Sequence, residues 1–288
     1  MKKSNLAFFG TSHYAVMILD ALKRAGLSPS LIITTPDKPA GKGMQLTPPP
    51  VKIWAQQEHI EVLQPEKLKE TSFLETLKAR NFDLFIVVAY GKIIPQEVIN
   101  ISPKGVLNVH ASLLPKLRGA SPIETAILQD EKHTGITIML IDSEMDHGPI
   151  IAQKEVSMDP WPPKARELGY TLVETGGQLL VEVIPQWLNG SIEAKPQDHS
   201  CATYTKKIVK EDALIDLSAD PYENFRKIQA YAEWPKPYFF TEKNSPAAQA
   251  GKKIRVIIKD AEYKNDTLVI KRVIPEGKKE MDYSAFFN

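Results

Sequence analysis

The chain has 288 residues, a formal net charge of +1, 43% hydrophobic residues and a single cysteine, Cys201. This length fits one large domain or two ordinary ones. The near-neutral charge excludes attraction of nucleic acid by a net positive charge of the whole protein, so any basic patch must be local. One cysteine excludes an intramolecular disulfide and fits a reducing compartment. No apolar run is long enough for a signal-peptide core or a membrane span, so we expect a cytoplasmic globular protein.

The first half of the sequence alternates short apolar runs with segments of helical spacing. Strands are predicted over 5–9, 31–34, 61–63 and 84–89, the last continuously apolar like a buried parallel strand. Helices are predicted from about residue 15 to Gly26, over 50–59, over 72–80 with Ser72 and Glu75 as a capping box, and over 95–100. This βαβ rhythm predicts an α/β fold with a doubly wound, mostly parallel, Rossmann-like sheet.

The segment 105–126 carries the most informative polar residues. A strand is predicted over 106–109, and Asn108 and His110 lie two residues apart, so both side chains leave the same face. A second strand is predicted over 135–141, and Asp146 lies in the acidic turn after it. We expect these two strands to be adjacent and to end near one another, which would bring the three side chains together. Ligands of such sheets bind at the carboxyl ends of the strands, so a site is expected there.

An amide, an imidazole and a carboxylate that converge can transfer protons and stabilise an oxyanion. Taken alone, an Asn-x-His pattern on a strand is more often a satisfied polar edge than a catalytic site. The Ser-Leu-Leu-Pro loop directly after His110 and the Asp-x-Gly turn after the next strand favour the catalytic interpretation.

The second half of the sequence predicts a long helix and a small separate domain. A short helix should start at Ser121-Pro122, and the long helix over 164–189 should be weakened or kinked by Gly176 and Gly177. A helix near 222–231 and strands over 238–241, 255–259 and 268–274 predict a β-rich module. We therefore expect a catalytic domain over 1–193, a polar linker over 194–206 and a C-terminal domain over 207–288.

Two features suggest a polyanionic partner. The segment 35–49 is a long loop rich in glycine and proline, with two lysines and no predicted secondary structure, and loops of this length are functional or disordered. Residues 206–288 hold 16 basic and 13 acidic residues, against 20 and 22 in the rest of the chain. This asymmetry suits a domain that faces a polyanion.

The sequence NVHASLLPKLRGASPIETAIL (108–128), followed by GITIMLIDSEMDHGPII (135–151), resembles the core of the 10-formyltetrahydrofolate-dependent formyltransferases and, within them, the methionyl-tRNA formyltransferases. The resemblance implies that Asn108, His110 and Asp146 are catalytic. It also implies that the loop after His110, with the end of the strand over 84–89, binds 10-formyltetrahydrofolate. The residues expected to bind this co-substrate are Ser112, Leu113, Leu114, Pro115, Tyr90 and Gly91.

Two further segments are similar to that family. TPDKPAGKG (35–43) looks like its inserted loop, which enters the tRNA acceptor stem, and YTKKIVKEDALIDLS (204–218) with IQAYAEWPKPYF (228–239) resembles its linker and its open OB-like module. The resemblance thus implies binding of initiator methionyl-tRNA, and we expect the protein to be a monomer. The residues expected to contact the tRNA are Lys38, Lys42, Lys206, Lys207 and Lys210.

The sequence departs from the family pattern at three places. His147 stands where the family has threonine in its Asp-Thr-Gly turn, and Ser12 stands where proline is usual. Between residues 259 and 267 the barrel looks shortened, as if strands were missing. The first two changes should leave the chemistry intact, whereas the third concerns how completely this domain grips tRNA.

The expected activity is formyl transfer from 10-formyltetrahydrofolate to the amino group of methionyl-tRNA. One alternative is a formyltransferase for a small amine such as an amino-sugar nucleotide, and another is a catalytically silent binding module. The loop over 35–49 favours tRNA, and the complete set of Asn108, His110 and Asp146 argues against a silent module. A dinucleotide site is disfavoured because the turn after Gly10 lacks the required glycines, and the six histidines show no paired spacing for a metal.

Overall fold

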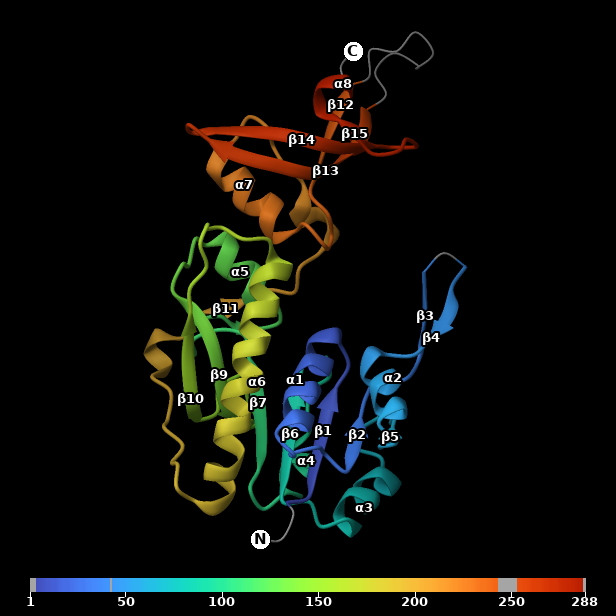
Figure 1. Cartoon of the computed structure of the whole chain (residues 1–288), viewed down its shortest axis with the longest axis vertical. Helices are drawn as coiled ribbons and strands as arrows, with labels where there is room; N and C mark the ends of the chain where they lie inside the picture. The colour runs from blue at the N-terminus through green and yellow to red at the C-terminus, as the bar shows by residue number, and fades with distance from the viewer. Residues whose placement is uncertain (1–3, 42, 243–252, 287–288) are drawn as a thin grey trace. The chain divides into compact units, whose positions relative to one another are not determined.

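A computed structural model describes residues 4–41, 43–242 and 253–286 (Figure 1). The chain forms two compact units, each assembled from separate segments. Unit 1 comprises Met1–Gly119, Thr134–Val156 and Gly169–Tyr204, and unit 2 comprises Ala120–His133, Ser157–Leu168 and Thr205–Asn288. The domain boundaries expected from the sequence stay a prediction.

A seven-stranded sheet forms the centre of unit 1, in the order β10-β9-β7-β6-β1-β2-β5. The five strands from β7 to β5 in this order pair in parallel, which confirms the predicted doubly wound, mostly parallel sheet. β1 and β6 are buried along their whole lengths, and this explains their uninterrupted apolar sequences. The strands are β1 (Leu6–Gly10), β2 (Leu31–Ile33), β5 (Glu61–Leu63), β6 (Leu84–Val88), β7 (Val106–His110), β9 (Thr134–Leu140) and β10 (Ile150–Val156).

β9 and β10 depart from the parallel pattern. β9 runs antiparallel to β7, with Leu140 opposite Leu107 and Thr137 opposite His110, and β10 runs antiparallel to β9. β9 therefore ends beside the beginning of β7. The expectation that these two strands end near one another is wrong, because it assumed that they run in the same direction.

Helices cover both faces of this sheet. α1 and α6 lie on the viewer's side in Figure 1. α3 and α4 pack through Phe73, Leu77 and Val98 into a buried apolar cluster with Phe9 and Phe85. The helices are α1 (His13–Arg24), α2 (Pro50–Gln57), α3 (Thr71–Ala79), α4 (Gln96–Ile99), α6 (Ala165–Asn189), of which the part from Gly169 belongs to unit 1, and the 3₁₀ helix η1 (His199–Cys201).

The two glycines within α6 serve close packing. The helix runs continuously from Ala165 to Asn189. A Cβ at Gly176 would lie 3.0 Å from side-chain carbons of Val109 and Ile136, and a Cβ at Gly177 would lie 2.9 Å from the Cβ of Ala21. The glycines thus let α6 approach both the sheet and α1, so the low helix propensity at these positions is offset by packing.

Two local expectations are wrong. The segment 35–49 contains a hairpin, since β3 (Lys38–Ala40) pairs antiparallel with β4 (Gln45–Thr47). Helix α3 begins at Thr71, so Ser72 lies inside the first turn and the N-cap residue Glu70 makes no side-chain capping bond. The Ser-x-x-Glu pattern placed the cap two residues too late, because Thr71 and Ser72 both belong to the helix and Glu70 is the N-cap.

The base of the β3–β4 hairpin is fixed by polar contacts. The Asp37 carboxylate lies 2.8 Å from Nζ of Lys52 and accepts a hydrogen bond of 2.7 Å from Nε2 of Gln64. The hydrogen bond from Gln64 and the ammonium of Lys52 hold the pKa of Asp37 below its ordinary value. These contacts attach the hairpin to the start of α2 and the end of β5.

Unit 2 contains an antiparallel sheet in the order β12-β13-β14-β15, which confirms the predicted β-rich C-terminal part. β13 and β14 are joined by a tight turn at Asn265 and Asp266, both with positive φ, as hairpin turns of this kind require. Residues 259–267, where strands looked missing, therefore continue β13 into the turn. The elements are α5 (Pro122–Leu128), η2 (Lys210–Ala213), α7 (Pro221–Ala230), β12 (Tyr238–Glu242), β13 (Lys253–Lys264), β14 (Thr267–Pro275), β15 (Met281–Asp282) and α8 (Tyr283–Phe286).

The core of unit 2 joins the sheet to α7. Ile228 of α7 packs with Phe239, Val256 and Val273 of the sheet and with Ile215. α5 and α7 also contact one another, and Arg226 Nη1 donates to the carbonyl oxygen of Leu128 at 2.9 Å. Among the described residues, no helix is both long enough and apolar enough to cross a membrane.

Candidate active site

Asn108 and His110 extend from the carboxyl end of β7 toward the same carboxylate. Nδ2 of Asn108 lies 3.5 Å from Oδ1 of Asp146, and Nδ1 of His110 lies 3.6 Å from Oδ2. His110 is buried and the other two side chains are half-buried. The predicted convergence of these three residues is therefore present in unit 1.

Asp146 reaches this position by a route that the sequence did not predict. β10 begins opposite Met139, close to the end of β9, and the loop between these two strands carries Asp146 to the side chains of Asn108 and His110 on β7. Asp146 has a left-handed φ of 49°, and its Oδ2 also accepts a hydrogen bond of 2.8 Å from the amide of Gly119. The carboxylate is thus held by the backbone amide of a neighbouring loop as well as by the turn that carries it.

The ring of His110 is fixed from its other side. Its Nε2 lies 2.9 Å from the carbonyl oxygen of Leu117, an acceptor only, so Nε2 must carry a hydrogen. Both ring nitrogens therefore face acceptor oxygens: Nε2 donates to the Leu117 carbonyl oxygen, and Nδ1 faces Oδ2 of Asp146 at 3.6 Å, beyond hydrogen-bond distance.

The loop over Ser112–Pro115 is held by the protein itself. Thr137 Oγ1 donates to the carbonyl oxygen of Ser112 at 2.6 Å and accepts from the amide of Leu114 at 3.1 Å. Nε2 of Gln153 donates to the carbonyl oxygen of Leu114 at 2.8 Å, and the Leu114 side chain is only 3% exposed. Packing beneath the loop therefore accounts for Leu114, whereas Leu113 and Pro115 are half-buried.

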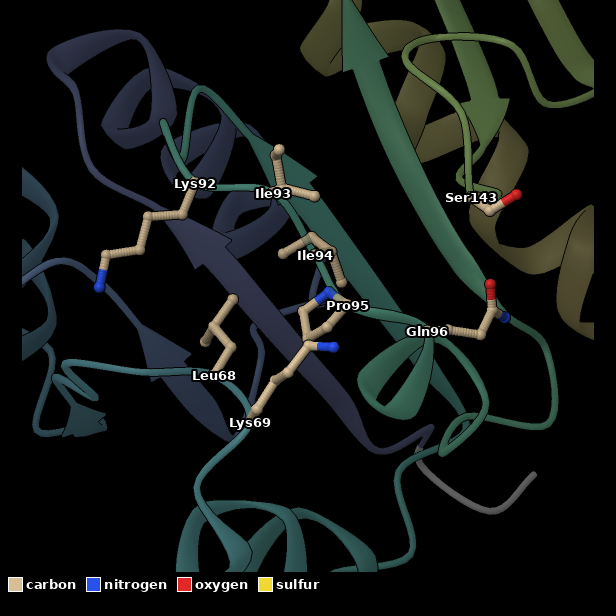
Figure 2. Close-up of a pocket in the computed structure, with 8 residues that line it drawn as sticks. All are labelled: Leu68, Lys69, Lys92, Ile93, Ile94, Pro95, Gln96 and Ser143. Carbon is tan, nitrogen blue, oxygen red and sulfur yellow. The ribbon is translucent and has the colours of Figure 1, made fainter.

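A cavity of about 450 Å³ is lined by the segment from Lys92 to Gln96, which directly follows the expected folate residues Tyr90 and Gly91 in the chain (Figure 2). Tyr90 itself is 2% exposed, and its burial raises the pKa of the phenol to about 12. The chain that follows Gly91 forms the wall, and Ser143 of the loop that carries Asp146 also contributes. The lining residues are Leu68, Lys69, Lys92, Ile93, Ile94, Pro95, Gln96 and Ser143.

None of these eight lining residues was predicted from the sequence, and none of the residues expected to bind the folate lines the cavity. Their signal was their position, since a segment directly after the carboxyl end of a central parallel strand is the usual place for a ligand. Ile93 is 93% exposed and lines the cavity, so its apolar side chain is accessible to a bound ligand.

The segment 197–204, expected to be part of a linker, also belongs to this site. Gln197 and Arg118 are both buried and contact one another, and the Thr203 carbonyl oxygen accepts a hydrogen bond of 2.9 Å from the Arg118 amide. This pairing joins β8 (Arg118–Gly119) to β11 (Tyr204–Thr205). No periodicity or charge pattern marked the segment as part of a site.

The lysines expected to contact tRNA are exposed where the structure describes them. Lys38 lies on β3 in unit 1, and Lys42 lies outside the described residues. Lys206, Lys207 and Lys210 are exposed in unit 2. Within the described ranges, no group of three or more histidine, cysteine, aspartate or glutamate side chains is placed to hold a metal ion.

A family model described as formyl transferase matches residues 3–184 of the chain. The chain belongs to the formyl transferase family. A methionyl-tRNA formyltransferase of Chloroflexus aurantiacus is 46% identical over 235 residues, which cover 82% of this chain and 76% of the relative. A methionyl-tRNA formyltransferase of Campylobacter curvus is 39% identical over 99% of this chain and 96% of its own length.

Solved structures share the fold at lower identity. The methionyl-tRNA formyltransferase from Clostridium thermocellum has a TM-score of 0.59 at 17% identity, covering 97% of this chain and 99% of its own. An N-formyltransferase from Helicobacter canadensis, solved with folinic acid and dTDP-3-aminofucose, has a TM-score of 0.62 at 19% identity, covering 88% and 95%. Since tRNA and sugar enzymes match equally well, the fold alone does not identify the formyl acceptor.

Proposed function

We propose that this protein transfers the formyl group of 10-formyltetrahydrofolate to the amino group of initiator methionyl-tRNA, giving the N-formylmethionyl-tRNA used to start translation. The observation that carries the chemistry is the convergence of Asn108 and His110 on Asp146 within 3.6 Å. The acceptor is supported by relatives named for methionyl-tRNA that match along nearly the full chain.

In this proposal Asn108 stabilises the developing negative charge, and His110 and Asp146 transfer the protons. 10-Formyltetrahydrofolate, when bound, supplies an activated formyl carbon that a neutral amine can attack. Asn108 has a second Nδ2 hydrogen available for the formyl oxygen, where negative charge develops. One such donor contributes about 3 kcal/mol of transition-state stabilisation, roughly a factor of 10² in rate.

His110 and Asp146 complete the proton balance. The attacking amine becomes positively charged and must lose a proton, and the departing N10 nitrogen must gain one. Asp146, directly or through a water, accepts the first proton, and His110 returns a proton to the leaving nitrogen. The contact of His110 Nε2 with the Leu117 carbonyl oxygen keeps the ring aimed while its Nδ1 faces Asp146.

We assign the ring system of the formyl donor to the cavity in Figure 2. Its volume of about 450 Å³, its apolar wall of Leu68, Ile93, Ile94 and Pro95, and a few polar groups are typical of small-ligand sites. The loop with Leu113 and Pro115 then supports the link toward Asn108. Assignment of Ser112, Leu113, Leu114, Pro115, Tyr90 and Gly91 to folate binding is part of this proposal, with Tyr90 and Leu114 acting from beneath the surface.

One assay distinguishes the two candidate acceptors. The protein is incubated with radiolabelled 10-formyltetrahydrofolate and either methionyl-tRNA or a dTDP-linked amino sugar, and label in each acceptor is measured. We expect label in methionyl-tRNA. Label in the amino sugar alone would replace the proposed acceptor, and label in neither would contradict formyl transfer to these amines.

A further inference from the structure

The Asp146 turn is held by a side chain that lies far away in the sequence. Gln197 is 5% exposed, and its Nε2 donates to the carbonyl oxygen of Asp146 at 2.9 Å and to that of Gly148 at 2.7 Å. Both hydrogens of this amide are therefore used on the backbone of one turn. Gln197 comes from the segment after α6, whereas the turn lies between β9 and β10.

The orientation of the Gln197 amide is imposed by a buried arginine. Arg118 is 1% exposed, and its Nη2 and Nε lie 2.7 Å and 3.2 Å from Oε1 of Gln197. A guanidinium can only donate, so the oxygen of the amide must face Arg118 and the NH₂ group must face the turn. Arg118 is in turn held by Nδ1 of His199 at 2.9 Å and by the hydroxyl of Tyr204 at 3.3 Å.

The same segment fixes the loop that orients His110. Thr203 Oγ1 accepts a hydrogen bond of 2.9 Å from the amide of Leu117, whose carbonyl oxygen faces His110. Residues 197–204 therefore hold both partners of the His110 ring, the Leu117 carbonyl from one side and the Asp146 turn from the other.

We propose that Gln197 is a positioning residue for Asp146. The proposal rests on the proposed function, because it concerns the same carboxylate. Without the amide, the carbonyl groups of Asp146 and Gly148 lose their donor and the left-handed turn at Asp146 is free to relax. The carboxylate would then leave the positions from which it faces Asn108 and His110, and misplacement of a catalytic group by about 1 Å costs roughly 10² in rate.

The test uses Gln197→Glu in the full chain. Glutamate has the same size and still accepts from Arg118, but its carboxylate has no hydrogen for the two carbonyl groups. The matched control is Asn5→Asp, which removes a similar amide-to-carbonyl bond, from Nδ2 of Asn5 to the Arg80 carbonyl oxygen at 2.8 Å. Asn5 precedes β1 and so lies at the opposite end of the sheet from the carboxyl ends of the strands.

We expect Gln197→Glu to lower kcat by about 10² while the KM values for both substrates change by less than about threefold. Asn5→Asp should keep kcat. Rates are measured well below the melting temperature of each variant, so that loss of folded protein does not contribute. A kcat of Gln197→Glu that returns to the wild-type value at low temperature would overturn the positioning role and leave a structural one.

A second measurement does not depend on activity. The Gly119 amide donates to Oδ2 of Asp146 at 2.8 Å, so its hydrogen-exchange rate reports where the carboxylate is. We expect faster exchange at Gly119 in Gln197→Glu and unchanged exchange at Ile141, whose amide bonds Val106. If the wild-type protein does not formylate methionyl-tRNA, the proposed function is wrong, but the exchange rate of the Gly119 amide still tests the positioning role of Gln197. Unchanged protection of Gly119 would overturn the inference whatever the activity.

Discussion

His110 Nε2 lies 2.9 Å from the carbonyl oxygen of Leu117, a buried residue whose φ of 58° is left-handed. A leucine in this conformation costs about 1–2 kcal/mol relative to the right-handed region. The strain is maintained by the hydrogen bond from the Leu117 amide to Thr203 and by burial of the side chain. It turns a backbone carbonyl toward the imidazole and so fixes which ring nitrogen faces Asp146.

The first prediction concerns the carboxylate. Asp146→Asn should keep the fold and folate affinity but lower kcat by about two orders of magnitude or more, because an amide cannot accept the amine proton or balance a protonated His110. Steady-state formylation rates and folate titration would measure the two effects. Near-normal turnover would remove Asp146 from the mechanism.

Asp142 provides the matched control for Asp146→Asn. It belongs to the same loop, but its carboxylate pairs with Nδ1 of His147 at 2.7 Å and accepts from the amide of Glu144 at 3.0 Å. Asp142→Asn should therefore change kcat far less than Asp146→Asn.

The second prediction separates loop packing from ligand contact. Leu114 is 3% exposed, so Leu114→Ala should lower the free energy of unfolding by about 2–5 kcal/mol, the usual cost of emptying a buried leucine site. Ile93 is 93% exposed at the rim of the cavity, so Ile93→Ala should leave the melting temperature unchanged and weaken folate binding about tenfold. Calorimetric melting and folate titration of both variants check this pair. Equal melting losses would contradict a ligand role for Ile93.

The third prediction concerns the acceptor. If Lys42 contacts one tRNA phosphate, Lys42→Ala should reduce the slope of log affinity against log salt by about one unit. The defect in methionyl-tRNA formylation should then be largest at low salt and shrink as salt rises, with folate affinity unchanged.

Lys154 is the control for Lys42, since it is an exposed lysine on β10 outside the proposed tRNA-binding set. Lys154→Ala should leave the salt slope as it is. Identical salt slopes for Lys42→Ala and the wild type would remove this lysine from the tRNA contact.

The fourth prediction concerns alkaline stability of unit 2. The Tyr222 hydroxyl donates to Oδ1 of Asp130 at 2.8 Å, and burial together with this carboxylate raises the Tyr222 pKa to about 12. A phenol whose pKa is raised by folding contributes stability that is fully present below its unfolded value of about 10 and is lost as pH rises through the folded value. The wild-type melting temperature should therefore fall between these limits, and Tyr222→Phe should show a shallower fall. Melting curves from pH 8 to about 12 measure the difference, and parallel curves would exclude the contact.

Much of the fold was predictable because the decisive signals are local. β1 and β6 are read from continuous apolar sequence, and Asn108 and His110 share a face through the two-residue period of a strand. The convergence on Asp146 was also expected, but from the wrong strand direction. Whether β9 runs parallel or antiparallel to β7 depends on connections across the sheet, and the apolar sequence of β9 suits both.

The contribution of Gln197 was not predictable for a related reason. A polar residue in an irregular segment has no period, and its contacts with Asp146, Gly148 and Arg118 connect parts of the chain that are far apart in sequence. The capping box at Ser72 failed in the opposite way, because a short motif matched although the observed N-cap, Glu70, lies two residues earlier. Local patterns therefore indicated the candidate catalytic residues and missed the long-range contacts that hold them in position.

The segmented composition of unit 2 determines how relatives of this protein can be recombined. α5 lies in Ala120–His133 and α7 in the C-terminal segment, yet Arg226 bonds Leu128 and Tyr222 bonds Asp130. A chimaera that takes only the residues after Tyr204 from another parent would place one parent's α7 against the other's α5. A graft that preserves the contacts of unit 2 has to transfer residues 120–133 and 157–168 together with the C-terminal segment. Exchange of the C-terminal segment alone between relatives is therefore disfavoured.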